Sequence, residues 1–363
     1  MKSNVTRTAL FISLQKGGMI NIFRLFICKS FDLLRSEGHL SLIFPMAYMC
    51  DLSAKALREF TLNENRIDYL ESFPERDDEN RRVFKSAKMS VCILGATKKK
   101  SDGDAQFPMR ISHDKYVDTS MPTAIMSKND IITIDSKSYT IPLVLPEEFA
   151  ILVKICEKAQ RIKEFSKCYT GEIDLSLNEK YVRLENSYAL MLRGAQVQKY
   201  YTTNIISQGD IYYLDDKMYL SENTSEKSHH HEVSRIVMQG ITGVNEKYRL
   251  KMTVSEAGTY CANSVNYLLI KEHLYYFLGL CNSKVLNWFF AKLSTNSNVN
   301  GYEVDNLPIR IGNPDEIENV ERTVEALLKN PSDYELSNRL DSIVYSIYGL
   351  STDEQAVIEK QTM

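Results

Sequence analysis

The sequence predicts an α/β segment followed by an α+β domain, and three observations support this prediction. In residues 21–44, a stretch with helical spacing of apolar residues precedes a short apolar run that ends at Pro45. After the polar, charged stretch 98–104, strand-like and helix-like stretches alternate less regularly. Residues 320–348 contain two further helical patterns. We therefore expect three parts, at 1–100, 101–312 and 313–363.

The first part is expected to form the back half of a doubly wound sheet. Its predicted helices lie at 21–35 and 53–62, and its predicted strands at 39–44, 66–70 and 88–95. Asn21 is a candidate N-cap for the first helix. The continuous apolar run 39–44 is typical of a buried parallel strand. The last two strands, joined by the charged loop 75–82, are expected to pair as a hairpin, as the final strands of such a sheet turn antiparallel.

The rest of the chain is expected to be a mixed domain with a helical ending. The predicted strands lie at 131–134, 139–145, 187–192 and 235–241, and the predicted helices at 146–165, 271–293, 320–329 and 334–348. The helix over 271–293 is interrupted at Asn282-Ser283, and Gly349 is a candidate C-cap. Residues 221–231 are expected to form a polar loop.

Composition excludes several classes of protein. The formal net charge is -3, so a nucleic-acid surface has to come from local clusters of Lys and Arg. The 7 cysteines are scattered without a Cys-x-x-Cys pair, which argues against a disulfide framework and against a zinc ribbon. The apolar runs are far shorter than the roughly 18 residues of a membrane span. We expect a soluble, cytoplasmic protein.

Short motifs then connect the two parts to one family. Residues 21–26 (Asn-Ile-Phe-Arg-Leu-Phe), 38–45 (Gly-His-Leu-Ser-Leu-Ile-Phe-Pro) and 83–85 (Val-Phe-Lys) resemble the end of the catalytic domain in adenine-specific (N6) DNA methyltransferases of the TaqI type, which serve type II restriction-modification systems. Five later elements resemble, in order, the TaqI-like C-terminal specificity domain: 192–197, 235–243, 260–266, 279–284 and 306–310. The ending 341–350 is similar to the C-terminal helix of such enzymes.

The resemblance implies methyl transfer from S-adenosylmethionine to an adenine flipped out of double-stranded DNA. Phe84 would stack on this adenine, a contact of about 1–3 kcal/mol. Alternatively, Phe84 closes the hairpin as a core residue. Phe26 would lie near the S-adenosylmethionine pocket, although it also fits the apolar face of its helix.

Other residues are assigned to DNA recognition by their chemistry and by the resemblance. Arginine and lysine neutralise phosphates, arginine also grips guanine, and asparagine or glutamine suits adenine edges. The candidates are Arg193, Gly194, Arg235, Gln239, Arg249, Lys251, Asn263, Asn266, Asn282 and Ser283. Each of them also has a structural alternative as a solvated or packing residue. The adjacent histidines 229–231 point in different directions, so we predict no metal site there.

The 363 residues contain neither the family's catalytic Asn-Pro-Pro-Tyr nor a Gly-rich cofactor turn. We therefore expect the chain to supply sequence recognition and the rear wall of the base pocket, and not to methylate DNA alone. A separate chain carrying the N-terminal catalytic half is the expected partner. The alternatives are a non-catalytic specificity subunit or a truncated remnant and, on the strength of Asp135 and Lys137 only, a fused restriction nuclease.

Overall fold

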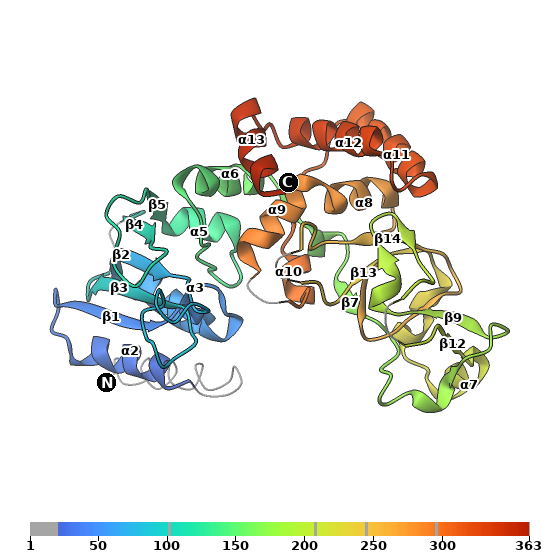
Figure 1. Ribbon diagram of the computed structural model, residues 1–363, viewed down its shortest axis with the longest axis horizontal. Helices are drawn as coiled ribbons and strands as arrows, with labels where there is room; N and C mark the ends of the chain where they lie inside the picture. Colours follow the sequence, from blue (N-terminus) through green and yellow to red (C-terminus); the bar gives the residue numbers. More distant parts are fainter. Residues whose placement is uncertain (1–20, 101–102, 207–208, 244–245, 295–296, 363) are drawn as a thin grey trace. The chain divides into compact units, whose positions relative to one another are not determined.

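The computed structural model describes residues 21–100, 103–206, 209–243, 246–294 and 297–362 (Figure 1). The chain divides into two compact units, Met1–Glu157 and Lys158–Met363. The first boundary expected from the sequence, near residue 100, lies inside the first unit. The assignment of functions to the parts 1–100, 101–312 and 313–363 stays a prediction. The architecture is mixed α/β with several sheets, in line with the predicted class.

The first unit is built on a five-stranded sheet in the order β1-β3-β2-β4-β5. The strands are β1 (His39–Pro45), β2 (Arg66–Phe73), β3 (Val91–Thr97), β4 (Gln106–Ile111) and β5 (Thr123–Ser127). β2 and β4 pair in parallel, and the other three pairings are antiparallel. Because β1 and β2 both run against β3, the strands β1, β2 and β4 point the same way. The loops that follow them therefore leave from one edge of the sheet, which we call the carboxyl edge.

One row of side chains across this sheet forms the core of the first unit. The row joins Leu42, Leu94, Leu70, Met109 and Ala124 through successive strand pairs. All but Leu42 are buried. Burying such a continuous apolar row is a main source of the unit's stability, since each fully buried aliphatic side chain contributes about 1.5–3 kcal/mol.

The helices of the first unit are α2 (Ile22–Leu33), α3 (Ala47–Cys50), the 3-10 turn η1 (Leu52–Ala54), α4 (Lys55–Glu64), α5 (Lys128–Ile134) and α6 (Pro146–Cys156). The predicted start of α2 is confirmed, since the Asn21 side chain accepts a bond from the Phe23 N–H at 3.4 Å. Arg58 of α4 is fully buried, and its guanidinium donates to the carbonyls of Ser138 at 2.7 and 2.9 Å and of Tyr48 at 2.7 Å. This side chain ties α4 to α3 and to the loop after α5.

Two predictions for residues 39–134 are wrong, whereas the predicted hairpin in the same range is confirmed. The strand at 39–44 exists, but it is an edge strand among the described strands, pairs antiparallel to β3, and buries only Phe44. Residues 131–134 belong to α5, because Ser127 caps that helix and the buried Ile131 and Ile134 are three residues apart. The predicted hairpin of β2 and β3 is confirmed.

The described residues of the second unit form two four-stranded sheets, in the orders β14-β13-β16-β7 and β15-β9-β12-β8, and two strand pairs, β10-β11 and β17-β6. The strands of the first sheet are β7 (Cys168–Thr170), β13 (Arg235–Gln239), β14 (Met252–Ser255) and β16 (Val265–Leu268). Those of the second sheet are β8 (Val182–Arg183), β9 (Ala189–Leu192), β12 (Tyr212–Leu214) and β15 (Tyr260–Cys261). The pairs use β6 (Gln160–Arg161), β10 (Val197–Gln198), β11 (Tyr201–Thr202) and β17 (Pro308–Ile309).

The longer helices of the second unit are α7 (Asp216–Glu222), α8 (Leu274–Asn282), α9 (Lys284–Leu293), α10 (Gly301–Asp305), α11 (Pro314–Lys329), α12 (Tyr334–Ile347) and α13 (Thr352–Thr362). Of these, α8, α9, α11 and α12 were predicted, whereas α7, α10 and α13 were not. Short 3-10 turns lie at Ile162–Glu164 (η2), Glu179–Tyr181 (η3), Gly194–Gln196 (η4) and Glu226–Glu232 (η5). The predicted interruption at Asn282-Ser283 separates α8 from α9, and Gly349 ends α12 with φ +64°.

Three further sequence predictions differ from the structure. The helix predicted over 146–165 ends at Cys156. Lys158 then adopts a left-handed backbone conformation, φ +58°, which is incompatible with an α-helix. Residues 139–145 form no strand. The predicted loop 221–231 instead contains the end of α7 and most of η5.

Candidate nucleic-acid interface

Four loops of the second unit meet around Ser264. We call residues 193–197, 239–243, 262–266 and 297–300 the Ser264 loop cluster. The Gly194 N–H donates to the Ser264 hydroxyl at 3.0 Å, and the Gly240 N–H donates to the Ser264 carbonyl at 2.8 Å. The Val299 N–H in turn donates to the Gly240 carbonyl at 2.9 Å. The sequence patterns at 192–197, 235–243 and 260–266 are thereby brought together in space.

Two glycines allow the close approach of these loops. A Cβ added at Gly194 would lie 2.6 Å from the Ser264 carbonyl oxygen, and one added at Gly240 would lie 2.9 Å from the same atom. Real Cβ atoms do not approach backbone oxygens so closely, so these positions require glycine for packing. Gly194, predicted as a DNA contact, is buried and uses its N–H for Ser264.

Four predicted DNA contacts keep part of their side chain at the surface. Asn263 is exposed, and Arg193, Gln239 and Lys251 are half-buried. Arg193 donates to the Asp210 carbonyl at 3.1 Å, with its guanidinium 4.9 Å from the centre of the Tyr212 ring. Gln239 donates to the Val197 carbonyl at 2.6 Å. Lys251 lies 3.1 Å from the Glu246 carboxylate.

The other two predicted cations are buried. The side chains of Arg235 and Glu172 are both 0% exposed and form an ion pair at 2.6 Å. The Arg235 guanidinium also lies 4.1 Å from the centre of the Tyr267 ring. Arg249 is 2% exposed and donates from Nε to the Thr242 hydroxyl at 2.9 Å. Burial lowers the pKa of Arg249 from its usual value. Both guanidinium groups therefore bind protein groups in the interior and are not exposed to solvent.

The remaining predicted contacts are also enclosed by protein. Asn266 donates to the Val299 carbonyl at 2.6 Å. Asn282 uses both ends of its amide on Met252, accepting from the N–H at 3.1 Å and donating to the carbonyl at 2.9 Å. Ser283 caps α9 by accepting from the Leu286 N–H at 3.3 Å. The Asn-Ser step therefore attaches the two helices to strand β14.

Sequence reasoning missed two residues that organise this region. Ser264 holds two loops, and Asn287 of α9 accepts a bond from the Leu250 N–H at 2.8 Å. Asn282 and Asn287 both interrupt the apolar pattern of 271–293, and a buried amide needs hydrogen-bond partners, which was the signal available in the sequence. Nothing in the pattern of the sequence distinguishes Ser264 from other loop serines.

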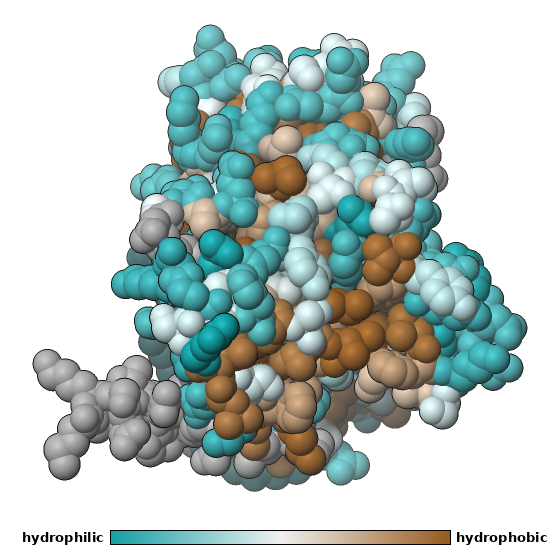
Figure 2. All heavy atoms as spheres, turned by 90° about the vertical axis from the view of Figure 1, so that its left-hand side faces the viewer, coloured by the Kyte–Doolittle hydropathy of each residue, from teal (hydrophilic) through white to brown (hydrophobic). Residues whose placement is uncertain are grey.

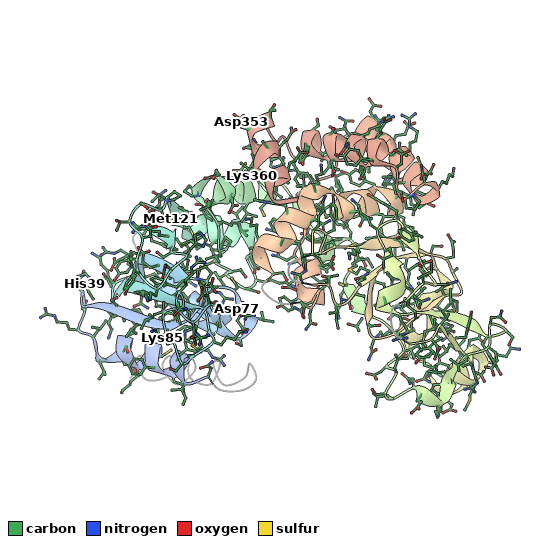
Figure 3. All side chains as sticks on the ribbon, in the orientation of Figure 1. His39, Asp77, Lys85, Met121, Asp353 and Lys360 are labelled. Carbon is green, nitrogen blue, oxygen red and sulfur yellow. The ribbon has the colours of Figure 1, made fainter. Side chains whose placement is uncertain are left out.

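At the carboxyl edge of the first unit, Phe84 lies in the loop after β2 and is 42% exposed. Arg82 fastens this loop by donating from Nε to the Lys85 carbonyl at 3.0 Å, and the Ser90 hydroxyl donates to the Pro74 carbonyl at 2.7 Å. Figure 3 shows Asp77 of the same loop and His39, the first residue of β1, at opposite ends of the sheet. The alternative that Phe84 is a core residue does not fit this exposure.

Phe26 is 61% exposed on α2. The buried positions of this helix include Ile27 and Phe31, whereas Phe23 stacks on Phe44 with ring centres 5.8 Å apart. Phe26 therefore stands on the outer side of the helix and is free to line a pocket formed with another segment.

The residues weighed for metal or nuclease chemistry have structural partners. The Asp135 carboxylate accepts from the Ser138 N–H at 3.0 Å and the Thr140 hydroxyl at 2.6 Å. His230 bonds the Tyr267 hydroxyl at 2.9 Å, and His231 bonds the Tyr260 hydroxyl at 3.0 Å. Within the described ranges, no group of three or more His, Cys, Asp and Glu side chains is arranged to hold a metal ion.

No helix in the described part of the chain is both long and apolar enough to cross a membrane.

Two family models match the chain. The Eco57I restriction-modification methylase model matches residues 9–78, of which 21–78 are described and run from α2 into the loop after β2. The TaqI-like C-terminal specificity domain model matches residues 189–309, which include the whole Ser264 loop cluster. These matches make residues 9–78 similar to restriction-modification methylases. More particularly, residues 189–309 are similar to the TaqI-like C-terminal specificity domain, so the two similarities lie in different parts of one chain.

Solved structures are similar in fold. The type IIL restriction-modification enzyme MmeI in complex with DNA matches with TM-score 0.55 and 10% identity, over 94% of this chain and 52% of that chain. This likeness concerns the fold alone. The type IIG restriction endonuclease BpuSI has TM-score 0.35 and 11% identity over 92% of this chain and 50% of that chain. The chain spans about half the length of both proteins. No curated protein matches it.

Proposed function

We propose that this chain is the sequence-recognition part of a DNA methyltransferase that acts on the N6 group of adenine in a restriction-modification system. The observation that carries the proposal is that the Ser264 loop cluster lies entirely within the match to the specificity domain. Loops held in fixed positions by backbone bonds present side chains to a DNA groove with little loss of entropy. Asn263, exposed on this cluster, is the first candidate for a base contact.

The first unit supplies the rear wall of the base pocket in this proposal. The order β1-β3-β2, with β3 running against both neighbours, is that expected for the end of a doubly wound sheet. Ligands of such sheets bind outside the carboxyl ends of the parallel strands, and Phe84 stands at this edge. An exposed aromatic ring there is suited to stack on an adenine that has left the duplex.

The cofactor expected from the methylase family is S-adenosylmethionine, which supplies the methyl group as an electrophile. The described residues fit only one wall of its site, the exposed ring of Phe26. The chain's 363 residues hold no Gly-rich turn of the kind that cradles the cofactor and no Asn-Pro-Pro-Tyr to hold the adenine amine. In the proposal these groups come from another polypeptide segment.

The surface of the first unit supports such a partner. β1 is an edge strand among the described strands, so its outer N–H and C=O groups are available to a further strand. Exposed apolar side chains accompany it: Ile43 on β1 is 43% exposed, and Ile22 and Leu33 on α2 are 77% and 76% exposed. Figure 2 shows hydrophobic side chains gathered in the lower half of that view. We infer that the segment with the catalytic tetrapeptide pairs with β1 along its outer side.

The proposed division of labour is tested with the purified chain. Selection from a randomised duplex library at fixed salt should enrich one sequence, and the chain alone should transfer no methyl group from labelled S-adenosylmethionine. Adding a chain that carries Asn-Pro-Pro-Tyr should restore transfer. Uniform binding to all duplexes would reject the recognition role, and methyl transfer by the chain alone would reject the need for a partner.

Phe84 gives a second test in the methylating complex. With 2-aminopurine at the target position, Phe84→Ala should leave the base unstacked and brighter, and weaken binding by about 1–3 kcal/mol. Met89→Ala is the matched control, since Met89 is 38% exposed and precedes β3 in the same connection. Equal fluorescence in the Phe84→Ala complex and the unmodified complex would show that Phe84 does not stack on the target base.

A further inference from the structure

The Ser264 loop cluster exposes one large aliphatic side chain among its polar groups. Ile241, between Gly240 and Thr242, is 63% exposed. Exposed single aliphatic residues are common on proteins and by themselves indicate nothing. What distinguishes Ile241 is that hydrogen bonds fix the backbone on both sides of it.

The backbone around Ile241 is fixed on both sides. The Gly240 carbonyl accepts from the Val299 N–H at 2.9 Å, and the Thr242 N–H donates to the Ser297 carbonyl at 2.8 Å. Ile241 itself forms an antiparallel bridge with Asn298. From below, the buried Arg249 donates to the Thr242 hydroxyl at 2.9 Å. A loop tethered in this way keeps its tip in place.

The side chain is stiff as well. Isoleucine is branched at Cβ, which restricts χ1, so little rotamer freedom remains to be lost on contact. A fixed, exposed aliphatic group therefore binds an apolar partner with a small entropic penalty.

The neighbours of Ile241 indicate what that partner is. Gly240, which precedes Ile241, donates its N–H to the Ser264 carbonyl, and Asn263 directly precedes Ser264 in the chain. The exposed amide of Asn263 therefore lies on the same loop cluster as Ile241. In the major groove, adenine offers N6 and N7 to an asparagine, and its partner thymine offers a C5 methyl group. That methyl is the one apolar group on the groove edge of an unmodified base pair.

We propose that Ile241 reads a thymine through its C5 methyl group in the major groove. The proposal rests on the recognition role of the Ser264 loop cluster given above. It assigns Ile241 as a specificity-determining residue. It also predicts that the recognised sequence contains a thymine at a position where uracil is not equivalent.

The test uses the 363-residue chain and the duplex enriched from the randomised library. Each thymine of that sequence is replaced in turn by uracil, which removes only the methyl group. The unmodified chain should lose about fourfold in affinity at one position, the effect of about one buried methyl group. Ile241→Ala should bind the thymine duplex about as weakly and should no longer distinguish uracil from thymine at that position.

Controls separate this contact from folding and from charge effects. Ile311→Ala removes another exposed isoleucine of the second unit, 49% exposed, and should keep the preference for thymine. Ile241→Val should lie between the unmodified chain and Ile241→Ala. The loss should be the same at two salt concentrations, because no phosphate contact is removed.

Several results would overturn the proposal while leaving the recognition role intact. These are an enriched sequence without thymine, no uracil effect at any position, or a uracil effect that Ile241→Ala retains. A failure of the recognition role looks different, since the library would then enrich no sequence at all.

Discussion

Two asparagines that both read as DNA contacts in the sequence have opposite surroundings in the structure. Asn263 is exposed, whereas Asn282 is 0% exposed and bonds both backbone groups of Met252. Removing a buried amide leaves its partners without bonds, at a cost of about 1–3 kcal/mol for each. The same change at the surface leaves stability within about 0.5 kcal/mol.

We therefore expect Asn282→Ala to lower the free energy of unfolding by about 2–6 kcal/mol in urea titrations. Asn263→Ala should leave that free energy unchanged and weaken binding to the selected duplex by about 1–3 kcal/mol. The two variants serve as controls for each other. A stable Asn282→Ala protein with weakened DNA binding would reverse the assignment.

Lys199 gives a prediction about pH. Burial lowers the pKa of the Lys199 ammonium to about 8 from 10.5, although the nearby Asp341 opposes this shift. The ammonium lies 4.3 Å from the centre of the Tyr248 ring. Between these two pKa values the unfolded chain binds more protons than the folded chain, so this group makes stability rise with pH from about 8 to 10.5.

Lys199→Met should therefore be more stable than the unmodified chain near pH 7, by about 1–3 kcal/mol, and the difference should shrink as pH rises toward 10.5. Thermal unfolding at a series of pH values measures this difference. Lys247→Met, at an exposed lysine 5.9 Å from the centre of the Tyr248 ring, should change stability near pH 7 by about 0.5 kcal/mol or less. A constant difference across the pH series would show that Lys199 is not the titrating group.

At the scale of elements, strong periodicity was enough to predict structure. The long apolar pattern of 271–293, broken at Asn282-Ser283, predicts α8 and α9, and serine is a favoured N-cap. Short apolar runs were ambiguous. Residues 131–134 contain isoleucines that suit a strand, but the Ser127 cap and burial at helical spacing decide for α5.

The apolar pattern of 39–44 also did not predict that one face of β1 is exposed. A continuous apolar run predicts burial on both faces, yet the outer face of β1 is open in the described chain, with Ile43 43% exposed. Such a run makes physical sense if a further segment covers it, which is the role proposed for the partner.

The candidate site was predicted in outline but not residue by residue. The order of motifs located the loops that meet at Ser264, because a sequence pattern reports which segments resemble a family. It does not report which arginine is buried. Arg235 lies in β13, where four consecutive residues from Arg235 on are buried, and the sequence does not reveal that its charge is paired with Glu172 inside the protein.

At the scale of the whole molecule, the unpaired side of β1 predicts a substitution that blocks association with the partner chain. Ile43→Asp should abolish association with a chain that carries Asn-Pro-Pro-Tyr, and with it methyl transfer, since a charge at an apolar contact is left desolvated. DNA binding by the chain alone should stay unchanged.

Ile125→Asp is the matched control for this prediction. Ile125 is 52% exposed on β5, at the other end of the sheet order, and its replacement should not affect association. Association is measured by analytical ultracentrifugation of the mixed chains. Normal association of the Ile43→Asp chain would place the partner elsewhere.

The double use of Ser264 has a consequence for altering target choice. Its hydroxyl and its carbonyl fix two loops through glycine N–H groups, at 3.0 and 2.8 Å, so the backbone there tolerates neither a bulkier residue nor a change of loop length. New targets are then reachable by exchanging outward side chains such as Asn263 on an unchanged backbone. Libraries that randomise those side chains and keep Gly194, Gly240 and Ser264 constant should give more folded variants with new sequence preferences than libraries that vary the loops whole.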